Sequence, residues 1–493
     1  MKMTGAAEAY FERAANEWDA LRAGYFTEAV REAAIARAYL RPEWTACDVG
    51  GGTGFVTAGL APRVARVHLV DGSPAMLEAA RRNLDGVANV EFGLMVDGRI
   101  PLPDAAVDAV FANMYLHHCA DPAAAIAEMV RILRPGGRLV ITDMDAHDHA
   151  WMREEMADEW PGFERAQVKA WLREAGLVNA YVDCSEQSCC ATSQMAPEAR
   201  AEVSVFVAVG TRGLSGARDA VRQHYGATAE REGGCDCSSE PAASCCSSES
   251  AFVAEIPLSS GCCGEEPITE IEWRTGYSDA ELNAAPQEAA TFTLGCGNPT
   301  AIASLKPGEV VVDIGSGGGL DSFLSAQRVG PSGHVIGVDM TPQMLERARA
   351  TAIRNSFTNV EFRQGHAEEL PVADGEADVV MSNCVINLCE DKGRVFEEAF
   401  RVLRPGGRIT VSDVVTSGAF PVEHQRDAAL WSSCVSGALP EREYLDLVRA
   451  AGFTGVESHG APSREPSRGT VAGVEVYSVI VTGHREVAAG CCG

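Results

Sequence analysis

The 493 residues include 41 Lys and Arg against 69 Asp and Glu, so the formal net charge is −28 at pH 7. This acidic balance argues against a nucleic-acid partner bound through a basic face, and it favours a small substrate. The first residues lack the apolar core of a signal peptide and no run of about eighteen apolar residues occurs, so we expect a cytoplasmic protein of two to four domains with no membrane partner.

The first forty or so residues place Tyr10, Phe11, Ala14, Trp18 and Leu21 at helical spacing. This periodicity predicts two amphipathic helices. They are either a packing cap on the domain that follows or a lid over a cofactor, and the sequence favours the cap.

A nucleoside-binding pattern follows these helices. An apolar run leads into Gly50, Gly52 and Gly54, and a second apolar run ends at Asp71. Glycines let backbone amides approach a ligand closely, and an acid at the end of the second strand accepts hydrogen bonds from a ribose. A dinucleotide fingerprint requires a third glycine where this chain has Phe55, so a single nucleoside is the better match.

The same pattern returns later in the chain at a constant spacing of 270 residues. The segment 108–113 has a counterpart at 378–383, and Arg131-Ile-Leu-Arg-Pro-Gly-Gly-Arg138 has one at 401–408. Alternating strands and helices in each copy predict an α/β fold with a mostly parallel sheet flanked by helices. We therefore expect two tandem Rossmann-like domains.

The segment between the copies has a different composition. It is rich in Ser, Gly, Cys and Glu and has few large apolar residues, so it cannot form a core of its own. The expected organisation is a first domain over 1–212, a short helix and flexible Cys-rich arm over 213–270, a second domain over 271–485 and a disordered Cys-containing tail over 486–493.

The second copy repeats the nucleoside pattern with Asp313-Ile-Gly-Ser-Gly-Gly-Gly319 and a following strand that ends at Asp339. Leu320 occupies the third-glycine position of a dinucleotide site. A G-x-G-x-G loop with this pair of acids resembles the class I S-adenosylmethionine methyltransferases. The predicted cofactor-binding residues are Gly295, Asp313, Gly315, Ser316, Gly317, Gly319, Asp339, Met340, Glu368 and Asn383.

Within that set, the loop glycines are expected at the methionine end of the cofactor, Asp339 at the ribose, and Met340 at the adenine. Glu368 is a further candidate on the adenine side. Asp313 is expected to orient the glycine loop.

The chain contains 17 cysteines, many in vicinal pairs such as Cys245-Cys246. Disulfide frameworks belong to short secreted chains, and no pair has the spacing of a structural zinc site, so a soft metal or metalloid is the better match. Cys296, Cys384 and Cys434 flank the predicted cofactor edge of the second copy. Each taken alone could equally be a small buried apolar residue.

Residues from about 217 to the end of the second domain resemble the arsenite S-adenosylmethionine methyltransferases. The most specific match is Ser382-Asn-Cys-Val-Ile-Asn-Leu388, supported by Leu294–Pro299 and by Cys434-Val-Ser-Gly-Ala438. The resemblance implies that Cys296, Cys384 and Cys434 bind As(III). It also implies an assisting thiol in the arm, with Cys245 or Cys246 as the candidates. The first copy resembles small-molecule methyltransferases of the ubiquinone type.

The resemblance implies transfer of a methyl group from S-adenosylmethionine to thiolate-bound arsenite, with thioredoxin or glutathione as the reductant. Soft thiolates suit As(III), and their affinity should fall as the pH drops below the thiol pKa values. The sequence leaves two alternatives. One is a methyltransferase of another small molecule, such as a quinone-type acceptor. The other is a non-catalytic, thiol-rich metalloid-binding protein.

Overall fold

The chain divides into two compact units, Met1–Leu214 and Ser215–Gly493. The computed structural model describes residues 5–193, 195–196, 198–214, 221–222, 225–226, 251–253, 272–274, 276–290, 295–420, 431, 435–460, 468–471 and 473–486. Much of the predicted arm, with Cys245 and Cys246, lies outside these residues, as do Cys434 and residues 487–493 of the predicted tail. In the part of the chain that is described, no helix is both long and apolar enough to cross a membrane.

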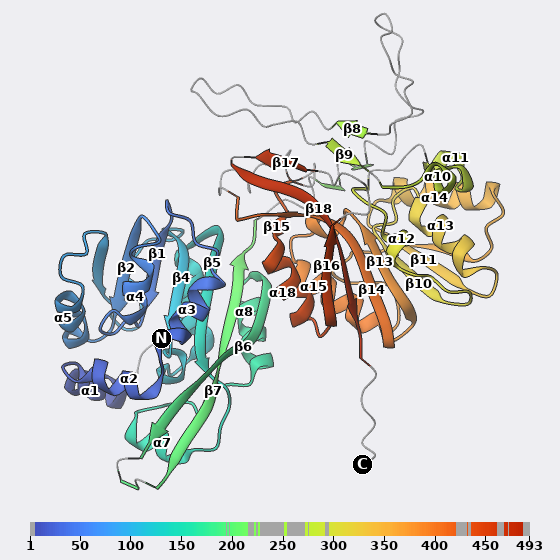
Figure 1. The fold of residues 1–493 in the computed structure, drawn as a ribbon. Helices are drawn as coiled ribbons and strands as arrows, with labels where there is room; N and C mark the ends of the chain where they lie inside the picture. The colour runs from blue at the N-terminus through green and yellow to red at the C-terminus, as the bar shows by residue number, and fades with distance from the viewer. Residues whose placement is uncertain are drawn as a thin grey trace, which may run out of the picture. The chain divides into compact units, whose positions relative to one another are not determined.

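The first unit is built around a seven-stranded sheet in the order β3-β2-β1-β4-β5-β7-β6 (Figure 1). Its strands are β1 (Thr45–Val49), β2 (Arg66–Asp71), β3 (Val90–Leu94), β4 (Val107–Asn113), β5 (Leu133–Met144), β6 (Leu177–Thr192) and β7 (Arg200–Arg212). Its helices are α1 (Gly5–Ala14), α2 (Trp18–Tyr25), α3 (Glu28–Ala36), α4 (Phe55–Leu60), α5 (Pro74–Asn83), η1 (Leu116–His118), α6 (Pro122–Ile132), α7 (Ala150–Glu155) and α8 (Arg165–Glu174).

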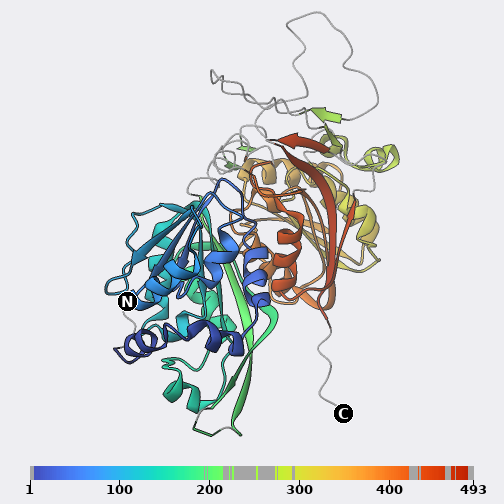
Figure 2. The same cartoon turned by 60° about the vertical axis from the view of Figure 1, so that its left-hand side comes forward.

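The pairing in this sheet follows from the sequence pattern. Strands β1 to β5 run parallel, and helices connect them except between β3 and β4, which are joined by a loop. Strand β7 runs antiparallel between β5 and β6. Figure 2 shows β6 and β7 as a long twisted pair that extends past the other strands.

The second unit contains a sheet whose main path is β12-β11-β10-β13-β14-β18-β16, with β15 and β17 attached to β14 and β18. Its strands are β10 (Val310–Ile314), β11 (His334–Asp339), β12 (Val360–Gln364), β13 (Ala377–Asn383), β14 (Leu403–Thr416), β15 (Leu439–Pro440), β16 (Thr454–Gly460), β17 (Arg468–Val471) and β18 (Val474–His484). Its helices are α10 (Asp279–Ala284), α11 (Gln287–Ala290), α12 (Pro299–Ile302), α13 (Leu320–Val329), α14 (Pro342–Arg354), η2 (Ile386–Leu388), α15 (Lys392–Val402) and α18 (Glu441–Ala450). A separate antiparallel pair is formed by β8 (Ala251–Val253) and β9 (Glu272–Arg274).

The main paths of the two sheets have the same strand order, so the predicted tandem α/β architecture is confirmed. Each sheet is mostly parallel with antiparallel strands at one edge. In both units the order reverses between the first strand and the fourth, that is between β1 and β4 and between β10 and β13. Ligands of open α/β sheets bind outside the carboxyl ends of the strands at this reversal.

Candidate active site

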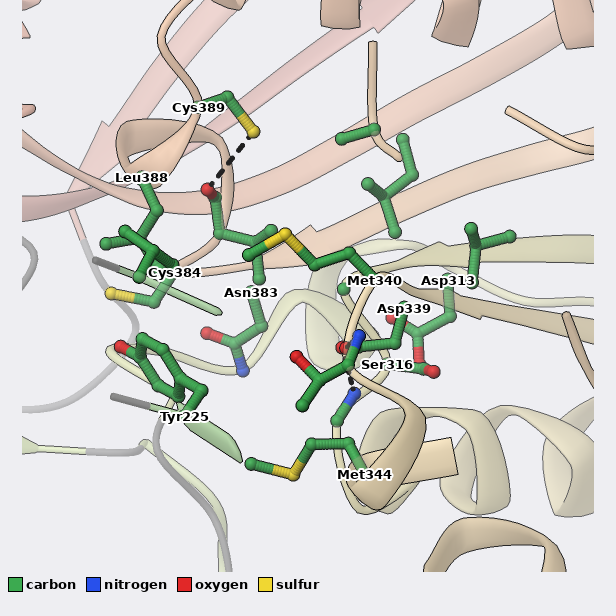
Figure 3. Close-up of a pocket in the computed structure, with 18 of the residues that line it drawn as sticks. Tyr225, Asp313, Ser316, Asp339, Met340, Met344, Asn383, Cys384, Leu388 and Cys389 are labelled. Carbon is green, nitrogen blue, oxygen red and sulfur yellow. Dashed lines mark hydrogen bonds between the residues drawn. The ribbon is translucent and has the colours of Figure 1, made fainter. Parts of the chain in front are cut away.

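A cavity of about 150 Å³ opens at this position in the second unit (Figure 3). Most of the residues predicted to bind the cofactor line it, namely Gly295, Asp313, Gly315, Ser316, Gly317, Asp339, Met340, Glu368 and Asn383. Cys384 also lines the cavity. In Figure 3, Cys384 and Tyr225 lie at one end and Asp339 and Asp313 lie toward the other.

Asp339 holds the glycine loop from the end of β11. Its carboxylate accepts one hydrogen bond from the backbone N–H of Gly317 (3.0 Å) and another from that of Thr341 (2.8 Å). Burial raises its pKa, and these two donors oppose that rise. Each carboxylate oxygen can accept more than one hydrogen bond, so Asp339 can also serve as an acceptor for a ligand that carries a diol.

Gly315 has a positive φ of 72°, and a Cβ at this position would lie 2.3 Å from a methyl carbon of Val385. Only glycine allows the loop and the segment after β13 to approach this closely. The glycine loop and the Ser382–Leu388 motif are therefore parts of one packed structure.

The structure gives two predicted residues more structural roles. Asp313, which lines the cavity, accepts a hydrogen bond from the Ser322 hydroxyl (2.6 Å) and so also holds the start of α13. Burial and the neighbouring Asp321 carboxylate raise the pKa of Asp313. Gly319 caps α13 at φ 92° and packs against Phe323, and it is not among the residues that line the cavity.

Cys296 and Cys384 belong to one cluster of buried hydrophobic side chains. Their exposed fractions are 1% and 6%. Val435, which directly follows Cys434 in the sequence, belongs to the same cluster. The fold thus brings together two of the three predicted arsenic-binding cysteines, together with the chain neighbour of the third.

Asn383, at the end of β13, connects the Cys296 loop to α13. Its side-chain oxygen accepts from the Cys296 backbone N–H (3.2 Å), and its amide donates to the Gly297 carbonyl (2.9 Å) and to Asp321 (3.0 Å). Tyr277 donates its hydroxyl to the same Asp321 carboxylate (2.7 Å). Sequence reasoning included Asn383 only as a cofactor contact and missed its partners Tyr277 and Asp321, because these partners are distant in the chain and belong to no motif.

A second thiol, Cys389, lines the cavity and was also missed. Its Sγ donates to the Val385 carbonyl oxygen (3.6 Å). Nearby, the buried Lys392 donates to the Cys389 carbonyl oxygen (2.7 Å). The sequence signal was present as a second cysteine five residues after Cys384, but it lies outside the motif.

Replacing Gly437 with alanine should destabilise this edge of the site. A Cβ there would lie 1.9 Å from the Asn387 carbonyl oxygen, which is backbone and cannot rotate away. Overpacking of this kind costs about 1–3 kcal/mol. We expect faster backbone hydrogen exchange over 435–440 in Gly437→Ala. Gly418→Ala is the matched control because no atom lies within 4 Å of its added Cβ, and equal exchange in the two variants would contradict the expected clash.

The first unit has a smaller cavity of about 60 Å³ in the corresponding place. Asp71 accepts there from the backbone N–H groups of Gly52 (2.9 Å) and Ser73 (2.8 Å), as Asp339 does in the second unit. Phe11 and Trp18 of the N-terminal helices line this cavity. These helices therefore contact the predicted cofactor site, as expected of a lid, as well as packing on the domain.

Comparisons with known proteins agree with this geometry. Models described as a methyltransferase domain match residues 47–141 and 305–452. The C-terminal region is similar to the arsenite methyltransferase of Halobacterium salinarum, with 50% identity over 197 residues, which is 40% of this chain and 50% of that protein. The human arsenite methyltransferase is 38% identical over 181 residues, covering 35% of this chain and 48% of that protein.

This chain spans about half the length of these arsenite methyltransferases. A demethylmenaquinone methyltransferase of Lactococcus lactis is 32% identical over 172 residues, which is 30% of this chain and 68% of that protein. Among solved structures, an arsenic(III) S-adenosylmethionine methyltransferase from Chlamydomonas reinhardtii matches with a TM-score of 0.39 and 34% identity, covering 42% of this chain and 73% of that one.

Proposed function

This chain belongs to the S-adenosylmethionine-dependent methyltransferases, with two domains of the class I fold, and we propose that its second domain methylates trivalent arsenic held by cysteine thiolates. The observation that carries the proposal is the pair Cys296 and Cys384, which share one cluster beside a cofactor cavity that Cys384 itself lines. A generic methyltransferase fold does not require a thiol there, since the first unit has Met114 at the position equivalent to Cys384.

S-Adenosylmethionine is the cofactor of this family, and the residues of the second unit fit it. Gly315, Gly317 and Asp339 line the cavity, and an acid at the end of the second strand is the usual acceptor for ribose hydroxyls in this fold. When bound, the cofactor supplies a methyl group activated by a sulfonium centre.

The cysteines supply the arsenic site. As(III) is soft, so thiolates of Cys296, Cys384 and Cys434 would replace its oxygen ligands and leave its lone pair free. Cys245 or Cys246 of the arm would capture arsenite first, and a thiol reductant such as thioredoxin or glutathione would recycle the site.

Burial of the thiols would favour methyl transfer. Cys296 and Cys384 are almost fully buried, and apolar side chains such as Val414 and Phe420 belong to the same cluster. Exclusion of water when the cofactor is bound would strengthen the electrostatic interactions inside the site. The lone pair then needs only to be oriented at a near-attack distance, because arsenic(III) held by three thiolates has no proton to remove.

Replacing Asn383 with alanine should lower kcat/KM for arsenite methylation by roughly 10- to 100-fold, since outer-sphere positioning residues commonly contribute that much. The variant loses the hydrogen bonds that hold the Cys296 loop against α13. Steady-state kinetics over a range of arsenite concentrations measure the effect. A purely structural role for Asn383 would reduce the melting temperature and leave the kinetics of the remaining folded protein unchanged.

The proposal is tested with the full chain, labelled S-adenosylmethionine, arsenite and excess thiol. We expect labelled methylarsenicals to accumulate with turnover. Tight arsenite binding without consumption of the cofactor would replace the proposal with a metalloid-binding function. Methyl transfer to a quinone-type acceptor together with indifference to arsenite would replace it with the other alternative.

A further inference from the structure

The first unit contains a second small cavity, of about 30 Å³, next to its cofactor cavity. The two cavities share four lining residues, Trp18, Phe26, Met114 and His118. The smaller one is also lined by His117, Asp158 and Cys189. In a class I methyltransferase, a chamber beside the cofactor is the place for an acceptor.

His117, His118 and Asp158 form a tight cluster in this chamber. One oxygen of Asp158, Oδ1, lies 3.7 Å from His117 Nε2 and 3.8 Å from His118 Nδ1. All three potential ligand atoms lie within 4.8 Å of one another. The three residues are 4%, 6% and 3% exposed, so the cluster is buried in the domain and is not a patch of surface charge.

Asp158 carries the strongest indication of a missing ligand. Neither of its carboxylate oxygens has a hydrogen-bond partner among the described residues, although both are buried. An ionised carboxylate buried in this way is costly unless a cation or a donor satisfies it. The neighbouring histidine nitrogens lie too far away to donate hydrogen bonds but close enough to share a metal ion with it.

Asp143 fixes the orientation of the His117 ring. Its Nδ1 lies 2.7 Å from Asp143 Oδ1, and Asp143 also accepts from the backbone N–H of Leu116 (2.9 Å) and of Met144 (2.8 Å). A carboxylate at Nδ1 fixes the tautomer that leaves Nε2 free as a ligand, an arrangement typical of metal-binding histidines. His117 Nε2 is the atom that faces Asp158.

The fold itself does not require these histidines. The second unit has Asn387 and Leu388 at the equivalent positions, 270 residues later, and it keeps the equivalent carboxylate, Asp413, bonded to the Asn387 backbone N–H (2.9 Å). The structural contact between carboxylate and turn is therefore common to both copies, whereas the imidazoles are particular to the first.

We propose that His117, His118 and Asp158 bind a divalent first-row transition metal ion, with Zn²⁺ as the best match, in the acceptor chamber of the first domain. Two imidazoles and a carboxylate suit Zn²⁺, and three protein ligands leave a fourth position open for an acceptor or water. Ligand atoms of tetrahedral zinc lie about 3.3 Å apart, so the two distances to Asp158 need to close by roughly half an ångström, and the distance between the two imidazole nitrogens by at most about 1.5 Å. Binding at His118 Nδ1 replaces its contact with the Ala157 carbonyl oxygen (3.2 Å).

The test compares the metal content of the full chain with that of single variants. The protein is saturated with Zn²⁺, desalted and analysed for zinc per chain, with Asp158→Asn and His118→Gln as the variants. Asparagine has the size of aspartate, and it removes the buried charge, so it should fold. We expect each variant to retain one zinc fewer than the native chain. His334→Gln is the matched control, since His334 lies in the second unit on an exposed Glu361 pair and should leave the count unchanged.

Cysteine thiolates are themselves zinc ligands, so the readout is the difference in zinc content between the native chain and each variant. Co²⁺ binding provides an independent readout, because Co²⁺ in a His–His–Asp site gives visible ligand-field bands without thiolate charge-transfer absorption. Those bands should disappear in Asp158→Asn, and Asp143→Asn should weaken the site by about 10- to 100-fold without removing it. Equal zinc in the native chain and Asp158→Asn, with unchanged Co²⁺ spectra, would overturn the proposal and leave only an ion pair between His117 and Asp158.

Discussion

Replacing Cys384 with serine should abolish arsenite methylation by the full chain while leaving cofactor binding intact. Serine is nearly isosteric but offers arsenic a hard oxygen in place of a soft thiolate. Loss of an outer-sphere residue commonly costs 10- to 100-fold, so loss of a direct ligand should lower kcat/KM by at least about 100-fold. Product formation from labelled cofactor measures the activity, and equilibrium dialysis measures cofactor affinity.

Cys190→Ser is the control for this variant, because Cys190 is an exposed thiol of β6 in the first unit. It should methylate arsenite at the native rate. Cys389→Ser is the informative neighbour, since Cys389 lines the same cavity. Arsenite methylation that survives in Cys384→Ser would contradict the proposed site, and loss of activity in Cys389→Ser would add a fourth thiol to it.

Replacing Asp339 with alanine should have the largest effect on the cofactor. The variant loses the acceptor for the Gly317 and Thr341 N–H groups, and with it the acceptor positions for the ribose. A hydrogen bond to a charged group contributes about 1.5–3 kcal/mol, so two lost ribose bonds lower cofactor affinity by roughly 10²- to 10⁴-fold. Arsenite methylation at a limiting cofactor concentration should fall in parallel, with arsenite binding retained.

The mirrored variant Asp71→Ala determines whether the two domains act separately. Asp71 has the same two backbone contacts in the first unit. If the second domain alone methylates arsenite, Asp71→Ala removes one of two cofactor sites and leaves the arsenite reaction unaffected. A loss as large as that of Asp339→Ala would instead show that both cofactor sites serve one reaction.

Cys384 and Met114 share an unusual backbone conformation that neither sequence motif predicts. Both have positive φ, 59° and 51°, and each follows the last residue of the equivalent strand. A left-handed conformation costs a non-glycine residue about 1 kcal/mol or more and is found most often at functional sites. In both copies this residue projects from the carboxyl edge of the sheet into a cavity, whether or not it carries a thiol.

The sequence alone was sufficient to predict the fold and the cofactor. Glycine loops, acids at strand ends and a repeat of constant spacing are local or periodic signals, and each reflects a steric or hydrogen-bonding requirement that few residue types meet. The two sheets and the S-adenosylmethionine-dependent family confirm these predictions. The three arsenic-binding cysteines stay a prediction, since Cys434 lies outside the described residues.

Tertiary structure decided what each side chain contacts across the fold. Asn383 donates hydrogen bonds to Tyr277 and Asp321. Gly319 packs at the start of a helix, and Asp158 comes from a distant segment to lie beside His117 and His118. These residues come from separate elements, so no spacing in the sequence reports their proximity. A parallel sheet brings the carboxyl ends of its strands together at one edge, where residues far apart in the chain meet in a buried site. The sequence therefore predicts which edge of the sheet binds the ligand. The tertiary structure shows which side chains contact one another there.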